Sequence, residues 1–140
     1  MRQYEILPHT ADGKFRAYGR TLEEAFANAA LAMASLMWDW RTIKPEIAHD
    51  IRASGRDREQ LLVNFLGEII YLLDTQRFLL AGVDRPRILE EGGVWSLEAV
   101  VSGDSLSDRY EIYGGVKAVT YNDLKIEDGD RVTVQVVVDM

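Results

Sequence analysis

The chain has 140 residues, of which 47% are hydrophobic and 28% are charged, and it contains no cysteine. This length supports one domain with a substantial core, so we expect a single domain over residues 1–140. The absence of cysteine excludes disulfides, thiolate metal sites and thiol nucleophiles, and two histidines are too few for a zinc site built from several imidazoles. Any bound metal would therefore have oxygen ligands.

Charge and hydropathy indicate which partners and which compartment suit the protein. The chain has 23 acidic and 16 basic residues, which gives a formal net charge of −7. Because direct nucleic-acid binding depends on clustered Lys and Arg, strong independent binding of RNA or DNA is not expected. No apolar run approaches the roughly 20 residues of a membrane span, and the first residues lack the apolar segment of a secretory signal. We therefore expect a cytoplasmic protein that does not bind membranes.

The first connection of the chain carries its densest group of chemically useful side chains. The segment Pro-His-Thr-Ala-Asp-Gly at residues 8–13 lies between two predicted strands, residues 2–7 and 14–19. Proline and glycine at its two ends are typical of a turn. The pattern predicts a turn that presents His9, Thr10 and Asp12 at the rim of a sheet, where loops tend to carry function.

Two helices are predicted from their start signals. Thr21-Leu-Glu-Glu24 is a capping box, and the apolar residues after it keep a helical period as far as residues 36–37. Asp57 is the predicted cap of a second helix, with Gln60 three residues later and a wide apolar stripe beyond it. Both helices are expected to cover one core.

The rest of the chain has the pattern of strands. A strand is predicted at residues 47–53 with His49 on its apolar side, where a packed imidazole is expected rather than a ligand. Pro86 predicts an edge strand or a bulge, and residues 103–108 a polar loop. Further strands are expected at residues 78–83, 87–91, 94–102, 116–127 and 131–138. This order predicts an α+β fold, a single-domain sandwich of mostly antiparallel sheet with two main helices.

A second group of candidate metal ligands, all carboxylate oxygens, lies at the end of the last predicted strand. Asp139 follows the apolar strand, and Met140 adds its main-chain carboxylate. Such charges repel one another unless they are hydrated or a cation lies between them. If the last strand pairs near the first two, Asp12 becomes a third donor, and three carboxylates without a soft ligand suit Mg²⁺, Ca²⁺ or Mn²⁺. From the residues alone, simple hydration of these acids remains the alternative.

Six short motifs follow one another along the whole chain: Tyr4-Glu5, His9-Thr-Ala-Asp12, Ala17-Tyr-Gly19, Thr21-Leu-Glu-Glu-Ala-Phe26, Lys117-Ala-Val-Thr-Tyr121 and Val138-Asp139. Together and in this order they resemble the signature of the archease family, small proteins that assist the GTP-dependent tRNA-splicing RNA ligase. The chain departs from the family pattern at Gly13-Lys14, where an apolar pair is usual, and at Asn122, where a histidine often stands.

The resemblance implies an accessory protein and not an enzyme. Such a protein would promote guanylylation of the ligase's active-site histidine and multiple turnover in tRNA ligation, and it would contact tRNA only indirectly. The resemblance also implies a divalent metal held by Asp12, Asp139 and Met140, where the two ends of the chain meet. His9 and Lys117 are implied as further candidates for function or partner binding.

Two other functions fit the residues. A stand-alone metal-dependent hydrolase would use a metal-bound water, with His9 as the proton acceptor, but the chain has no phosphate loop or nucleophile motif. A general chaperone or adaptor would recognise its partners through apolar surface. Lys117 also has a plain interpretation as a solvated lysine on a strand.

Overall fold

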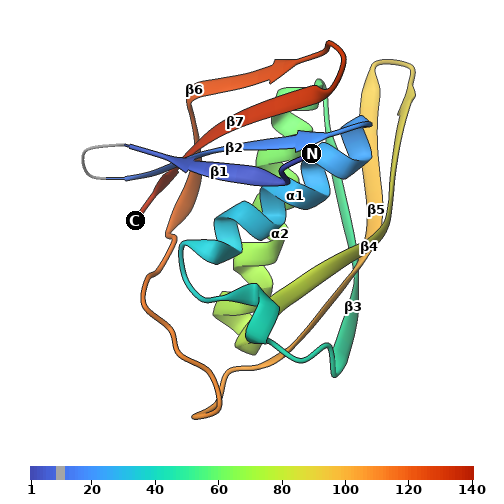
Figure 1. Cartoon of the computed structure of the whole chain (residues 1–140). Coiled ribbons are helices and arrows are strands. Elements are labelled where there is room, and N and C mark those ends of the chain that lie inside the picture. Colours follow the sequence, from blue (N-terminus) through green and yellow to red (C-terminus); the bar gives the residue numbers. More distant parts are fainter. Residues whose placement is uncertain (9–11) are drawn as a thin grey trace.

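Two helices lie between two antiparallel sheets in the computed structural model, which describes residues 1–8 and 12–140 (Figure 1). Within these residues the elements are β1 (Tyr4–Leu7), β2 (Gly13–Gly19), α1 (Leu22–Ser35), the short 3₁₀ helix η1 (Trp40–Thr42), β3 (Ile47–Gly55), α2 (Arg58–Gln76), β4 (Phe78–Glu91), β5 (Val94–Ser105), β6 (Ala118–Glu127) and β7 (Val132–Asp139). The strand orders are β1-β2-β7-β6 in the first sheet and β3-β5-β4 in the second, and the pairings are antiparallel. The predicted α+β class is confirmed.

Both helices begin with the same two-way capping arrangement. At the start of α1, Thr21 Oγ1 accepts a hydrogen bond from the Glu24 N–H at 3.1 Å, and Glu24 Oε1 accepts one from the Arg20 N–H at 3.0 Å. At the start of α2, Asp57 and Gln60 accept the equivalent bonds at 2.7 and 2.9 Å. Each pair of side chains satisfies backbone donors at a helix start, and both predicted starts are confirmed.

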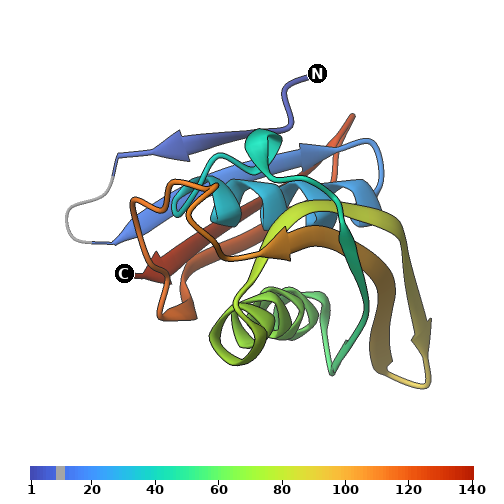
Figure 2. The ribbon, with the colours of Figure 1, turned by 90° about the horizontal axis from the view of Figure 1, so that it is seen from below.

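A hydrophobic core fills the space between the helices and the sheets. Helix α1 packs against β2 and β4, and α2 packs against β3 and β6, so each helix contacts both sheets (Figure 2). Phe26 of α1 stacks with Phe65 of α2, with 6.3 Å between the ring centroids. His49 packs edge-on against Phe78 at 4.9 Å, which is the packed imidazole that the sequence predicts. Among the residues described, no helix combines the length and the apolar character that a membrane span requires.

The predicted break at Pro86 does not occur. Strand β4 continues through this residue as one strand, with register shifts between Leu80 and Gly82 and between Asp84 and Arg87. Because β4 is an edge strand of its sheet, the missing N–H of Pro86 needs no partner. The expected bulge and edge position are present, but the division into two strands was wrong.

The predicted polar loop at residues 103–108 begins later, because β5 extends to Ser105. A Cβ atom added to Gly103 would lie 1.9 Å from the carbonyl oxygen of Leu79. Glycine at this position therefore allows β5 and β4 to approach closely, a role that the local sequence does not distinguish from that of a loop glycine.

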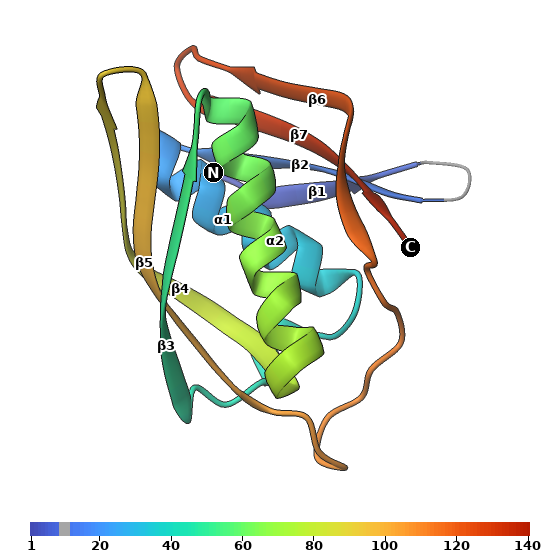
Figure 3. The same cartoon turned by 180° about the vertical axis from the view of Figure 1, so that it is seen from behind.

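Strand β7 is central in the first sheet and lies between β2 and β6. Gly13 of β2 pairs with Val138, and Ala118 of β6 pairs with Asp139. The start of β2, the end of β7 and the start of β6 therefore lie side by side (Figure 3). We call this side of the first sheet, formed by strand ends, the common edge. The start of the chain lies toward the opposite edge, because Tyr4 pairs with Ala17. The last strand thus meets the beginning of the second strand, and not Met1.

Candidate functional site

Asp12 and Asp139 lie at this common edge of the first sheet. Asp12 directly precedes Gly13, the first residue of β2, and Asp139 directly follows Val138 in β7; Gly13 and Val138 are paired. Continuing the register by one residue places Asp12 opposite Asp139. Asp12 is partly buried and Asp139 is exposed. The structure therefore brings together two of the side chains that the sequence assigned to one site.

Extending the alternation of side chains along β2 by one residue would put Asp12, which directly precedes the strand, on the face of Lys14. Asp139, at the end of β7, lies on the face of Val137. Lys14 and Val137 are themselves paired, which makes this one face, opposite to that of the buried core residue Phe15. Two carboxylates that are adjacent across strands repel each other, and a cation between them removes the repulsion.

No ion pair within residues 1–8 and 12–140 neutralises either Asp12 or Asp139. The same residues contain no cluster of three His, Cys, Asp or Glu side chains that could hold a metal ion. The donors at this edge are therefore two side-chain carboxylates, and the third predicted donor is the main-chain carboxylate of Met140. His9, the other candidate in the first turn and the proposed base of a hydrolase, lies outside the described residues.

The side chain of Met140 is held in a socket behind the two aspartates. A Cβ atom on Gly13 would lie 3.0 Å from Met140 Sδ, and one on Gly114 would lie 3.4 Å from Met140 Cε. Leu36, at the end of α1, closes the socket, since its Cδ1 atom lies 2.7 Å from the Gly13 Cβ position. Two glycines thus leave room for the thioether, and this packing fixes the main chain directly after Asp139.

The segment between β5 and β6 forms one wall of the socket and is fastened to the end of α1. Tyr113 donates its backbone N–H to Met37 O at 2.9 Å and its hydroxyl to Ser35 O at 2.8 Å. These carbonyls belong to the turn where α1 ends and its backbone acceptors lack helical partners. Although Tyr113 is more than half exposed, partial desolvation of its phenol raises the pKa of this group, and the nearby Asp39 raises it further. The neutral hydroxyl therefore persists as a donor, and Gly114 is held beside Leu36.

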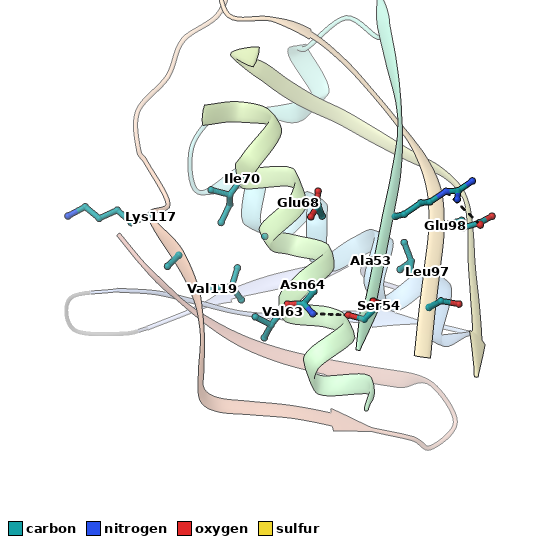
Figure 4. A pocket seen from close by; sticks show the side chains of 14 residues that line it. Ala53, Ser54, Val63, Asn64, Glu68, Ile70, Leu97, Glu98, Lys117 and Val119 are labelled. Atoms are coloured by element: carbon teal, nitrogen blue, oxygen red, sulfur yellow. Dashed lines mark hydrogen bonds and ion pairs between the residues drawn. The ribbon is translucent and has the colours of Figure 1, made fainter. Parts of the chain in front are cut away.

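Lys117 connects this edge to a groove over α2. Its backbone N–H donates to Asp139 O at 2.7 Å, while its side chain is exposed and has no ion pair in the described part of the chain. Lys117 lines an open groove of about 770 Å³ between β3 and β6, which includes Gly67 of α2. In Figure 4 the Lys117 side chain extends away from α2, whereas Val119 lies beside the helix. Neither Asp12 nor Asp139 lines this groove.

The sequence did not predict an ion pair on the face of the two aspartates. Lys14 Nζ lies 3.6 Å from Asp123 Oδ2. Asp123 belongs to β6, which is separated from β2 by β7. The contact depends on a bulge in β6, and no local pattern around residue 123 indicated where that bulge would place its side chains.

The comparisons with known proteins agree over nearly the whole chain. Residues 4–140 match the Archease protein family (MTH1598/TM1083). Protein archease of Methanosarcina acetivorans is 40% identical over 141 residues, covering 99% of this chain and 97% of that protein. Protein archease of Pyrococcus furiosus is 40% identical over 128 residues, covering 91% and 89%.

Two solved structures share the fold. The solution structure of Methanobacterium thermoautotrophicum protein 1598 has a TM-score of 0.86 and 30% identity, and the match covers 100% of both chains. The crystal structure of an archease, a possible chaperone, from Thermotoga maritima has a TM-score of 0.62 and 22% identity, covering 100% of this chain and 98% of that one. At 22% identity this second likeness concerns the fold alone. With a family match over residues 4–140 and relatives that are 40% identical, this chain belongs to the archease family.

Proposed function

We propose that this protein activates a GTP-dependent tRNA-splicing RNA ligase. It would promote guanylylation of the ligase's active-site histidine and so allow multiple turnover in tRNA ligation, acting in the cytoplasm as an accessory protein and not as an enzyme. Membership of the archease family supports this proposal.

The observation that carries the proposal is the pairing of Gly13 with Val138, which brings the adjacent residues Asp12 and Asp139 to one edge of the first sheet. With the main-chain carboxylate of Met140 they form a set of hard oxygen donors, which fits Ca²⁺, Mg²⁺ or Mn²⁺ and no soft metal. We assign a divalent cation to these three residues. When bound, the cation would supply a positive centre among the carboxylates. Lys117 and His9 are the further candidates for contact with the partner.

The charge of the chain suits a protein partner that itself binds RNA. With a net charge of −7, the protein would be repelled by RNA but attracted to a basic, RNA-binding ligase. Complementary charge accelerates encounter and disfavours wrong partners. The protein would therefore act on the ligase, and on tRNA only indirectly.

Multiple-turnover RNA joining by the cognate ligase, with GTP and a divalent metal, tests this function. We expect Asp12→Ala and Asp139→Ala to abolish the stimulation while the circular dichroism of the folded protein is retained. Asp74→Ala is the matched control, because Asp74 is an exposed acid on α2 and its loss changes the net charge equally. If Asp12→Ala and Asp139→Ala both stimulate the ligase as well as the wild type does, the site has no part in the mechanism.

A general chaperone or adaptor is the second candidate, and exposed apolar side chains favour it. Ile112, Tyr113 and Tyr121 are 41%, 57% and 55% exposed. A general chaperone would bind unrelated unfolded clients and would do so equally well after metal removal. Binding of several unfolded proteins by chelator-treated protein, with no preference for the ligase, would favour this candidate over the specific activator.

A further inference from the structure

We propose that the Lys14–Asp123 ion pair controls the cation affinity of the Asp12–Asp139 edge: Asp123 holds the Lys14 ammonium away from the two carboxylates and keeps them available to a divalent cation. This inference rests on the proposed metal site. It concerns two residues outside that site, and it assigns to Asp123 the role of a positioning residue.

Lys14 is a basic residue placed to compete for the two carboxylates. It is the second residue after Asp12, and it pairs with Val137, which is two residues before Asp139 on the same face of β7. Same-face neighbours along a strand, and diagonal neighbours across strands, lie about 7 Å apart, within reach of a long side chain. Without another partner, the Lys14 ammonium would therefore pair with Asp12 or Asp139.

Strand β6 carries Asp123 to Lys14 across the intervening strand. The register of β6 with β7 shifts between Thr120 and Lys125, which leaves residues 121–124 as a bulge. Asp123 in this bulge has φ 52°, a left-handed conformation that is uncommon for a non-glycine residue. Its carboxylate reaches Lys14 Nζ at 3.6 Å, although β6 and β2 are not neighbours.

The bulge is held over β7 by a buried amide. Gln135, which is 4% exposed, donates Nε2–H to Asp123 O at 2.8 Å and accepts at Oε1 from Arg16 Nε at 2.9 Å. The backbone of Asp123 is therefore fastened independently of its carboxylate. This arrangement allows the carboxylate to be neutralised without releasing the bulge, so charge and structure can be changed separately.

The charge of Asp123 should affect the affinity of the site for a divalent cation. Removing the Asp123 charge leaves Lys14 as a competing partner in the metal-free protein and as a repelling charge in the metal-bound protein. The interaction of a divalent cation with one unit charge at about 7 Å in water corresponds to an affinity change of about 5- to 10-fold at low salt. The effect should shrink at high ionic strength, because salt screens charges at this separation.

Titration calorimetry of chelator-treated protein with Ca²⁺ or Mn²⁺ tests the inference. We expect Asp123→Asn to weaken binding about 5- to 10-fold at low salt, and Lys14→Met combined with Asp123→Asn to restore wild-type affinity. The matched control is Asp128→Asn, which breaks another ion pair, Arg58–Asp128 at 3.0 Å, and should leave the affinity unchanged. Circular dichroism would verify that each variant is folded.

The possible failures are distinguishable. If the wild type binds the cation and Asp123→Asn binds equally well, the inference is overturned while the metal site stands. If Lys14→Met does not restore the affinity of Asp123→Asn, the loss reflects a disturbed bulge and the electrostatic role is wrong. If neither Ca²⁺, Mg²⁺ nor Mn²⁺ binds the wild type, both the proposed metal site and this inference fail.

Discussion

The backbone N–H of Lys117 donates to the carbonyl oxygen of Asp139 at 2.7 Å, while the Lys117 ammonium forms no ion pair with any residue that the structure describes. Lys117 is therefore tied to the carboxylate edge by its main chain, while its side chain is exposed. Its backbone and its side chain have separable roles, and two substitutions distinguish them.

Lys117→Met keeps the N–H and removes the charge. We expect the free energy of unfolding to change by less than about 0.5 kcal/mol, because the side chain is exposed, whereas stimulation of the ligase should fall if the ammonium contacts the partner. Lys117→Pro removes the N–H and should destabilise the protein by about 1–3 kcal/mol. Urea unfolding and multiple-turnover ligation measure the two effects. Full ligase stimulation by Lys117→Met would show that the lysine is only a solvated side chain.

The socket of Met140 depends on Gly114, for which neighbouring Gly115 is a matched control. A Cβ atom on Gly114 would lie 2.3 Å from Leu36 O, so Gly114→Ala must displace the backbone, at a cost of about 1–3 kcal/mol. A Cβ atom on Gly115 would meet nothing within 4 Å, so Gly115→Ala should be nearly neutral. Urea denaturation of both variants checks this difference. Equal stability of the two would mean that the turn accommodates a side chain at either position.

The local signals in the sequence were sufficient to locate most of the elements. The caps at Thr21 and Asp57 specify helix starts because the bonds that define them span only three or four residues. The course of β4 through Pro86 and the strand role of Gly103 could not be predicted in this way. Both depend on which strand lies alongside, and the decisive neighbour of Gly103 is the carbonyl of Leu79.

The candidate site shows the same division between local and long-range information. The sequence could place Asp12 and Asp139 at strand ends, but their proximity also required that the last strand pair near the first two, which was an assumption. The Lys14–Asp123 pair could not, because it requires a register shift in β6 and a contact across β7. A bulge is determined by the pairing of a whole strand, so neither residue carries a local signal of the contact.

Acid should destabilise the protein partly through Asp104. Tyr110 donates its hydroxyl to Asp104 Oδ2 at 2.6 Å, and this bond, with one from the Ser105 N–H, holds the pKa of Asp104 below its usual value. A depressed pKa in the folded state stabilises the protein above the unfolded pKa of about 4, and this contribution is lost as the pH falls through the folded value.

Asp104→Asn should therefore flatten the dependence of the melting temperature on pH below about pH 4, and Tyr110→Phe should flatten it partly. The measurement is thermal unfolding by circular dichroism from neutral pH downward. Asp108→Asn is the control, because Asp108 is exposed and its carboxylate has no hydrogen bond in the described structure. An Asp104→Asn profile that falls as steeply as that of the wild type would contradict this assignment.

Divalent cations should stabilise the chelator-treated protein, and neutralising either aspartate should remove this stabilisation without weakening the metal-free protein. Ca²⁺ at 100 times its Kd would add about 2.7 kcal/mol to the free energy of unfolding. In Asp12→Asn and Asp139→Asn this gain should disappear, while the metal-free variants become as stable as the metal-free wild type or more so, because the repulsion across the strands is removed. Asp74→Asn should retain both the stabilisation by Ca²⁺ and the stability of the metal-free wild type. Thermal unfolding with and without the cation gives all of these values, and a full Ca²⁺ response in both edge variants would show that the cation binds elsewhere.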